Sequence, residues 1–424
     1  MNIKEISGGV RLCTHKTAKF KNSVVTLNLL TPLSQDAAKN ALLIHLLART
    51  NKNYDTLMNM NRRLASLYGA VISPSVSKIG EVQVLSLSLL CLDDRFALGN
   101  DKVWEEGVKL LCTCLFKPDI TPDGFREENI QREKRLLIEK IESRKDEKRL
   151  YALDRMTEEM CRDEAYGISQ LGKTEDIEKI TGKELMEAWK KLLFSCPIQI
   201  NVTGNIDEKR TEKIFSSLFD SLARDKKAVT ELHTEFLTEA YESRTVTEKQ
   251  KVKQGKLVIG MRAGMTYDYD NYAAIKVMCA IFGSGTFSKL FTNVREKMSL
   301  CYYCSARLVN NKGLIIVESG VETENALKAL NAIRNELDDI RKGIFTDEVI
   351  ENAKKSITDT LSSVDDSIMT LDHWMTSQTT SGLFRTPESF IDEINSVSRE
   401  EIIIAASMVT EDTVFILESE KEEE

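Results

Sequence analysis

The chain contains 424 residues with a formal net charge of −8 and a pI near 5.4, and 42% of its residues are hydrophobic. A domain usually spans about 100 to 200 residues, so this length predicts two domains with sizeable cores. The acidic balance argues against nucleic acid as a partner, and the lack of a long apolar run or signal-peptide core predicts a cytoplasmic protein without membrane insertion.

The N-terminal half contains a series of segments with clear patterns. In chain order they are a strand at residues 24–30, an apolar helix at 37–48, the segment NRRLASLYGA at 61–70, a long helix with a polar interruption at 128–156, and a β-run at 197–204. Before the β-run, Thr181 and Glu184 have the spacing of a capping box, in which the hydroxyl and the carboxylate each satisfy a helix N–H.

The C-terminal half repeats this order. Its segments are a strand at residues 256–262, an apolar helix at 271–283, the segment VREKMSLCYYCSA at 294–306, an interrupted helix at 351–375, and a β-run at 412–419. A second capping box, Ser398 with Glu401, again precedes the β-run. Arg62 lies 233 residues before Arg295 at matching points of the two halves.

Matches at several segments in one order are difficult to obtain without duplication of an α+β unit. We therefore predict two homologous domains, residues 1–222 and 244–424. The charged stretch 223–243, with weak apolar periodicity, is the predicted linker between them.

Three segments point to a known family: GSGTFSKLFTNVREKMSLCYYCSA (283–306), AYGISQLGKTEDIEKITGKELMEAWKKLL (165–193) and the opening GGVRL. They are similar to segments of the insulinase/pitrilysin-like (inverted zincin) metallopeptidases, and the resemblance covers nearly the whole chain. It implies the metallopeptidase-like LuxS/insulinase fold: two homologous domains, each an antiparallel sheet packed against helices. Two such halves enclose a clamshell chamber for unfolded peptide.

Active members of this family carry H-x-x-E-H on the helix after the early strand, where two histidines on one helix face hold zinc and the Glu is the general base. The corresponding residues here are Ala41, Ile44 and His45, so only the last His remains. The third ligand, a Glu on a second helix, corresponds to Lys140, and a register shift of one would leave Glu139 as the nearest carboxylate. We expect no bound zinc, no other cofactor and no catalysis by this chain alone, and we interpret His45 as a core residue.

The resemblance also implies a retained pair. Family members, or their partner subunits, place an Arg and a Tyr seven residues apart in the C-terminal domain, where the two side chains contact peptide and the developing oxyanion. Arg295 and Tyr302 match in identity and spacing. A guanidinium can hold a carbonyl or carboxylate, and a phenol can donate to a tetrahedral oxygen. In the structural alternative, Arg295 makes a salt bridge at a helix end and Tyr302 packs at the start of a strand.

The chain is thus similar to zinc-deficient bacterial subunits of the YmfF type within this family. We expect a heterodimer with a zinc-bearing homologous peptidase subunit, unfolded peptide as substrate, and Arg295 and Tyr302 contributed to the partner's zinc site. A peptide-binding or scaffold module without a role in hydrolysis is the alternative. The sequence leaves a homodimer open as well.

The nine cysteines are odd in number and lie mostly in apolar segments, which predicts reduced, buried thiols. Cys112 and Cys114 are expected in a helix core. Cys301 and Cys304 have CxxC spacing, but residues i and i+3 of a regular strand point to opposite faces. We therefore expect neither a redox pair nor half a zinc site there.

Overall fold

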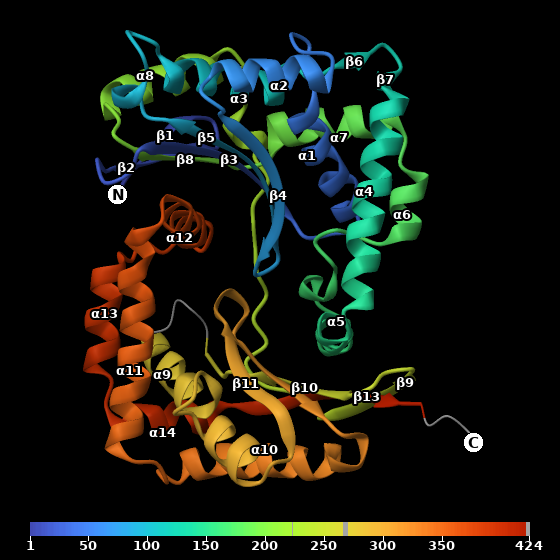
Figure 1. Cartoon of the computed structure of the whole chain (residues 1–424), viewed down its shortest axis with the longest axis vertical. Helices are drawn as coiled ribbons and strands as arrows, with labels where there is room; N and C mark the ends of the chain where they lie inside the picture. Colours follow the sequence, from blue (N-terminus) through green and yellow to red (C-terminus); the bar gives the residue numbers. More distant parts are fainter. Residues whose placement is uncertain (223, 266–269, 421–424) are drawn as a thin grey trace. The chain divides into compact units, whose positions relative to one another are not determined.

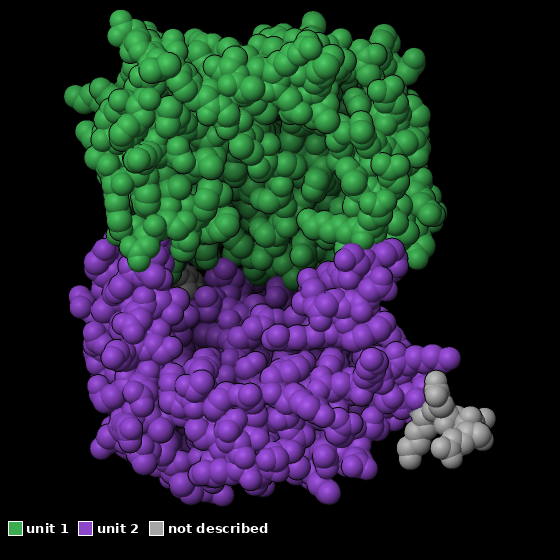
Figure 2. All heavy atoms as spheres, viewed as in Figure 1, with its two compact units in different colours: residues 1–141, 168–233, 365–382 green, residues 142–167, 234–364, 383–424 purple. Residues whose placement is uncertain are grey.

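The computed structural model describes residues 1–222, 224–265 and 270–420 (Figure 1). The chain forms two compact units: unit 1 consists of residues 1–141, 168–233 and 365–382, and unit 2 of residues 142–167, 234–364 and 383–424 (Figure 2). Each unit therefore includes a segment from the other half of the sequence. The border at 233/234 lies inside the predicted linker 223–243, whose first residue is outside the described residues.

Unit 1 is built on a six-stranded sheet in the order β1-β2-β8-β3-β5-β4. Neighbouring strands are antiparallel except β2 and β8, which are parallel. Along β3, Val25, Leu27 and Leu29 enter the apolar core, while Thr26 and Asn28 lie on the opposite face. The strands are β1 (Asn2–Ser7), β2 (Val10–Lys16), β3 (Asn22–Pro32), β4 (Val71–Ile79), β5 (Val82–Leu92) and β8 (Ile198–Gly204).

Helices cover the apolar face of this sheet (Figure 1). Helix α1 is buried around most of its circumference because it is apolar on nearly all sides. The predicted capping box forms at the start of α7. The helices are α1 (Ala37–Arg49), α2 (Leu57–Ser66), α3 (Val103–Phe116), α4 (Glu127–Asp146), α6 (Thr174–Lys179), α7 (Gly182–Ser195) and α8 (Glu208–Asp220), and a short ribbon pairs β6 (Ile120–Thr121) with β7 (Gly124–Phe125).

Unit 2 has a five-stranded sheet in the order β11-β12-β10-β13-β9, antiparallel except for the parallel pair β13 and β9. The strands are β9 (Arg244–Gln250), β10 (Gly255–Arg262), β11 (Cys301–Val309), β12 (Leu314–Val321) and β13 (Thr410–Ser419). The helices are α9 (Tyr272–Gly283), α10 (Ala326–Arg341), α11 (Asp347–Ser362), α13 (Pro387–Ser396), α14 (Arg399–Met408) and the π-helix η4 (Leu290–Lys297).

The interrupted helices are confirmed, and each interruption lies next to a border between units. In the first half α4 is followed by α5 (Lys148–Met160), and in the second half α11 is followed by a 3₁₀ turn and α12 (Ile368–Thr380). Helix α5 belongs to unit 2, where it packs on β10 and β13. Helix α12 belongs to unit 1, where it packs on β3 and β8.

The α+β fold expected from the duplicated pattern is confirmed: each unit is a mainly antiparallel sheet with helices packed on it. Among the described residues, none of the helices combines the length and apolar character that crossing a bilayer requires.

Candidate functional site

Helix α1 carries the positions that correspond to the zinc ligands and general base of the resemblance. Ala41 and Ile44 are buried in the core and provide no ligand atom. His45 is partly exposed, and its Nδ1 lies 2.8 Å from the carbonyl oxygen of Ala41, one turn earlier. A carbonyl oxygen only accepts, so Nδ1 carries the proton of this bond. The imidazole is therefore held against its own helix.

Helix α4 carries the position of the third ligand. Lys140 and Glu139 are both exposed there. Nearer the start of the same helix, Glu133 forms an ion pair with Arg49 of α1, and both side chains are largely buried. This pair was not predicted from the sequence. Its only signal was a basic residue four positions after His45, which places Arg49 on the same face of α1.

These residues do not fit a catalytic zinc ion, which takes three protein ligands and an open position for water. Helix α1 contributes one imidazole, and Lys140 of α4 is an ammonium that repels a divalent cation. Across the part of the chain that the structure describes, no three His, Cys, Asp or Glu side chains lie close enough to hold a metal ion together. The α1–α4 region thus cannot activate a water molecule on a metal.

Arg295 lies in the π-helix η4, a rare conformation that is frequent at functional sites. Its guanidinium lies over the ring of Phe291, 4.5 Å from the centroid, and 3.6 Å from a carboxylate oxygen of Glu296. The Arg295 side chain is 38% exposed. A surface ion pair of this kind contributes about 0 to 1 kcal/mol. The guanidinium can therefore exchange Glu296 for a carbonyl or carboxylate of a ligand at small cost.

Tyr302 is the extra residue of a β-bulge. The register between β11 and β12 shifts between Cys301 and Tyr303, so Tyr302 has no partner in the ladder. Bulges re-aim side chains next to functional sites, and Tyr302 is 62% exposed. Its hydroxyl donates a hydrogen bond to Glu322 at 2.8 Å. This bond raises the pKa of Tyr302, so the phenol keeps its proton at neutral pH.

The strand that carries Tyr302 lies at the edge of its sheet. Strand β11 pairs with β12 on one side only, and η4 packs against it. An edge strand presents backbone N–H and C=O groups that an added extended segment can pair with. The structure thus brings Arg295 and Tyr302 to the start of one open edge, with the cation on the helix and the phenol on the bulge.

The same bulge overturns the expectation for the CxxC segment. Cys301 lies opposite Val321, and Cys304 lies opposite Ser319. Val321 and Ser319 are two residues apart on β12 and share a face, so the two cysteines also share a face. Residues i and i+3 point to opposite faces only in a strand without an extra residue, and Tyr302 is such a residue here.

The two thiols interact. A hydrogen bond from the Cys304 side chain is the largest cause that lowers the pKa of Cys301 to about 7, and the charge of Arg295 acts in the same direction. The same contact, together with burial, raises the pKa of Cys304. Of the nine cysteines, Cys301 is half-buried and the other eight are buried.

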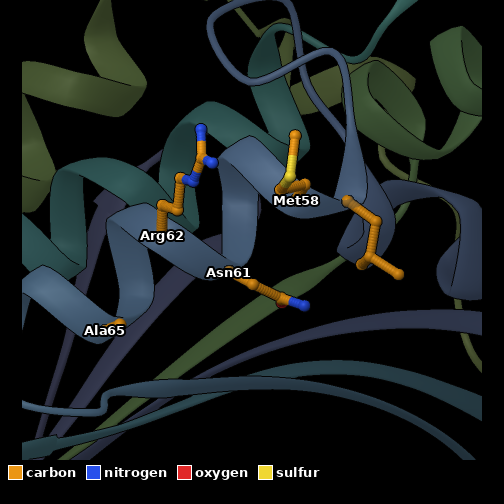
Figure 3. Close-up of a pocket in the computed structure, with 5 residues that line it drawn as sticks. Met58, Asn61, Arg62 and Ala65 are labelled. Atoms are coloured by element: carbon orange, nitrogen blue, oxygen red, sulfur yellow. The ribbon is translucent and has the colours of Figure 1, made fainter.

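A shallow hollow of about 610 Å³ lies along α2 (Figure 3). It is lined by Leu57, Met58, Asn61, Arg62 and Ala65. These side chains offer apolar contact, an amide and one guanidinium. No carboxylate, imidazole or thiol is among the lining residues, so the hollow has no acid–base chemistry of its own.

Comparisons with known proteins find relatives that are described as inactive peptidases or peptidase domains. A family model described as "Peptidase M16 inactive domain" matches residues 179–357. The chain is 30% identical to the "Probable inactive metalloprotease YmfF" of Bacillus subtilis (strain 168) over 416 residues, which cover 98% of this chain and 97% of that protein. A crystal structure of a conserved protein from Enterococcus faecalis V583 has a TM-score of 0.92 and 27% identity, and the match covers 100% of this chain and 99% of that one. A structure described as a peptidase M16 inactive domain from Pseudomonas fluorescens has a TM-score of 0.81 at 17% identity over 100% and 99% of the two chains, which bears on the fold alone.

Proposed function

The chain belongs to the M16 peptidase family as an inactive, insulinase-like homologue, and we propose that it is the non-catalytic subunit of a heterodimeric peptidase. In this role it binds unfolded peptide and contributes Arg295 and Tyr302 to the zinc site of its partner. One observation carries the proposal: the zinc donors are missing from α1 and α4, whereas a guanidinium and a protonated phenol remain at the open edge of β11.

The edge of β11 supports the peptide-binding part of this role. An extended peptide can pair with its backbone, which gives affinity without dependence on peptide sequence. Arg295 would then hold a peptide carbonyl or carboxylate by charge-assisted hydrogen bonds. Tyr302 would move its hydroxyl from Glu322 to the oxygen that becomes negative in the tetrahedral intermediate.

The chemistry that the chain lacks defines the partner. Hydrolysis requires a zinc ion, its water and a general base, none of which the α1–α4 region can hold. A second copy of the chain would bring the same incomplete donor set. The productive partner is therefore a zinc-bearing homologous subunit, and a homodimer would have no peptidase activity.

The test uses the complex of this chain with a zinc-bearing homologue from the same organism. Arg295→Ala should lower kcat about a hundredfold, the usual effect of removing one transition-state donor, while size-exclusion chromatography still shows the complex. Lys297→Ala is the matched control, because Lys297 is an exposed cation of the same π-helix whose Nζ contacts Asn293 at 2.9 Å. Its kcat should stay at the wild-type value.

The alternative is a scaffold or peptide-binding module without a role in hydrolysis. It is favoured by the internal partners of both side chains, Phe291 and Glu296 for Arg295 and Glu322 for Tyr302. Unchanged kcat in the Arg295→Ala complex would remove the residue assignment. Full activity of the zinc-bearing subunit in the absence of this chain would favour the scaffold.

A further inference from the structure

Cys301 differs from the other cysteines of the chain in its surroundings. Burial raises the pKa of several of them to about 12, among them Cys13, Cys91, Cys196 and Cys279. These thiols are protonated at neutral pH and shielded from reagents, so they are inert. Cys301, at the exposed start of β11, is half-buried and has a second thiol on the same face of its strand.

The environment of this pair favours a thiolate at Cys301. The side chains of Cys304 and Ser319 and the positive charge of Arg295 on the adjacent π-helix all lower the pKa of the Cys301 thiol. Cys304 is buried and keeps its proton. One accessible thiolate next to one protonated, buried thiol is the arrangement of an attacking and a resolving cysteine.

We propose that Cys301 and Cys304 are a redox-active pair, which hydrogen peroxide oxidises to a disulfide. The Cys301 thiolate attacks one peroxide oxygen, the O–O bond breaks, and the leaving hydroxide takes a proton to become water. Cys301 is then a sulfenic acid. The Cys304 sulfur attacks the Cys301 sulfur, the S–O bond breaks, and the departing hydroxide takes the Cys304 proton. Two thiols lose two electrons in total, the peroxide becomes two waters, and an external dithiol reverses the change.

The position of the pair gives the oxidation a structural consequence. The disulfide closes a ring that contains Tyr302 and Tyr303, and therefore the bulge that exposes Tyr302. The ring also lies beside η4, the helix of Arg295. The redox state of the pair thus acts on the segment that carries both side chains of the proposed function, although the oxidation itself does not depend on that function.

Trypsin allows a direct test on the full chain, because cleavage after Lys297 and Arg307 releases MSLCYYCSAR, which contains both cysteines and no others. The reduced protein is treated with one equivalent of hydrogen peroxide, unreacted thiols are alkylated under denaturing conditions, and the digest is weighed. We expect this peptide to be two hydrogens lighter and unalkylated, whereas peptides with the buried cysteines are fully alkylated. Oxidation of another cysteine before these two would overturn the proposal.

Two isosteric variants separate the roles of the pair. Cys304→Ser should leave a Cys301 sulfenic acid that dimedone captures, and Cys301→Ser should abolish both disulfide and dimedone adduct in this peptide. Cys279→Ser, in the buried helix α9, is the matched control and should oxidise like the wild type. Circular dichroism checks that each variant is folded. A folded Cys301→Ser protein in which peroxide still modifies Cys304 at the wild-type rate would contradict the assignment of Cys301 as the attacking thiol.

Discussion

Helices α5 and α12 occupy matching places in the two halves of the sequence, yet they pack on their sheets through different chemistry. In unit 2, the face of α5 that lies on β10 and β13 is apolar, and the helix also forms ion pairs from Arg149 to Glu318 of β12 and from Arg155 to Glu248 of β9. Ala152, Met156 and Met160 of the helix pack against Val258 of β10 and Phe415 of β13. Such contact is non-directional and depends mainly on the apolar area removed from water.

A buried ion network follows directly after α5. Arg262 of β10 is 2% exposed and donates to Glu164 at 2.7 Å and to Asp412 at 2.8 Å. Lys312, fully buried, lies 2.6 Å from Glu164. Two cations thus face two carboxylates inside unit 2, and every one of these charges depends on the others for its stability in the low-dielectric interior.

In unit 1, α12 lies on the sheet through polar groups. Thr26 of β3 donates a hydrogen bond to Asp372 at 2.9 Å, and Asn201 of β8 donates to Thr376 at 2.8 Å. Asn28 of β3 also donates to Thr376, at 3.3 Å. Asp372 is 1% exposed, and its second carboxylate oxygen has no hydrogen-bond donor among the described residues. An incompletely satisfied buried carboxylate makes this contact sensitive to pH.

Two helices at matching places of a duplicated sequence can therefore be attached to their sheets by contacts that respond differently to pH. Apolar packing with a balanced ion network holds α5 to unit 2 at all moderate pH values. The polar contact of α12 contains an uncompensated carboxylate, which lowers its stability when ionised. We therefore expect α12 to open more readily than α5 near neutral pH.

The largest expected effect comes from breaking the ion network beside α5. Arg262→Met leaves Glu164 and Asp412 with too little positive charge, and the free energy of unfolding of unit 2 should fall by about 3 to 5 kcal/mol. Hydrogen exchange of β10 and β13 fragments in increasing urea measures it. The control is Arg144→Met, since Arg144 and Asp154 are 2.7 Å apart but both partly exposed, and its effect should stay within about 1 kcal/mol. Equal losses in the two variants would contradict the contrast.

A smaller effect, of opposite sign, is expected at α12. Burial raises the pKa of Asp372 to about 6, above about 3.9 in the unfolded chain. The folded unit therefore holds this proton more tightly, and the contribution of Asp372 to stability is greatest below about pH 4 and declines as pH rises through 6. Asp372→Asn should raise the free energy of opening of α12 by about 2 to 3 kcal/mol at pH 7.5. At pH 4 the substitution should change this free energy little.

Hydrogen exchange of fragments from α12, corrected for the intrinsic rate at each pH, measures this difference. Asp123→Asn is the control, because Asp123 is an exposed carboxylate of unit 1, and its variant should match the wild type at both pH values. A constant difference between Asp372→Asn and wild type across pH 4 to 7.5 would show that the carboxylate does not titrate in this range.

The order of elements could be predicted from the sequence because each half repeats local patterns that specify helices and strands by themselves. The exchange of α5 and α12 could not, since the periodicity of a helix shows which face is buried but not which sheet buries it. Asp372 and Thr376 are typical of a solvated helix face and gave no sign of burial. The predicted domain borders at 222 and 244 follow chain order, so they assign α5 to the N-terminal domain and α12 to the C-terminal domain.

For the candidate site, the sequence likewise shows the residues and their spacing but not the irregular elements that carry them. The identities and spacing of Arg295 and Tyr302 are visible in the sequence, and so are the absence of a zinc ligand at Ala41 and of the general base at Ile44. The π-helix and the bulge were not, because each is one irregular insertion in a regular element and depends on tertiary contacts. That bulge decides the face of Cys301, which is why the pattern of a regular strand predicted it incorrectly.

The smallest expected effects test the part of the two halves that is alike. The capping boxes at α7 and α14 have the same geometry: Thr181 Oγ accepts from the Glu184 N–H at 3.3 Å, and Ser398 Oγ accepts from the Glu401 N–H at 3.2 Å. Thr181→Ala and Ser398→Ala should each destabilise the first turn of their helix by about 1 kcal/mol. Hydrogen exchange of these turns measures it, and Thr181→Ser, which keeps the hydroxyl, should have little effect.

Because a cap acts through its own helix, equal losses would localise the difference between the halves to the contacts of α5 and α12. A clearly larger loss at one cap would mean that the difference extends to the local structure of the duplicated helices.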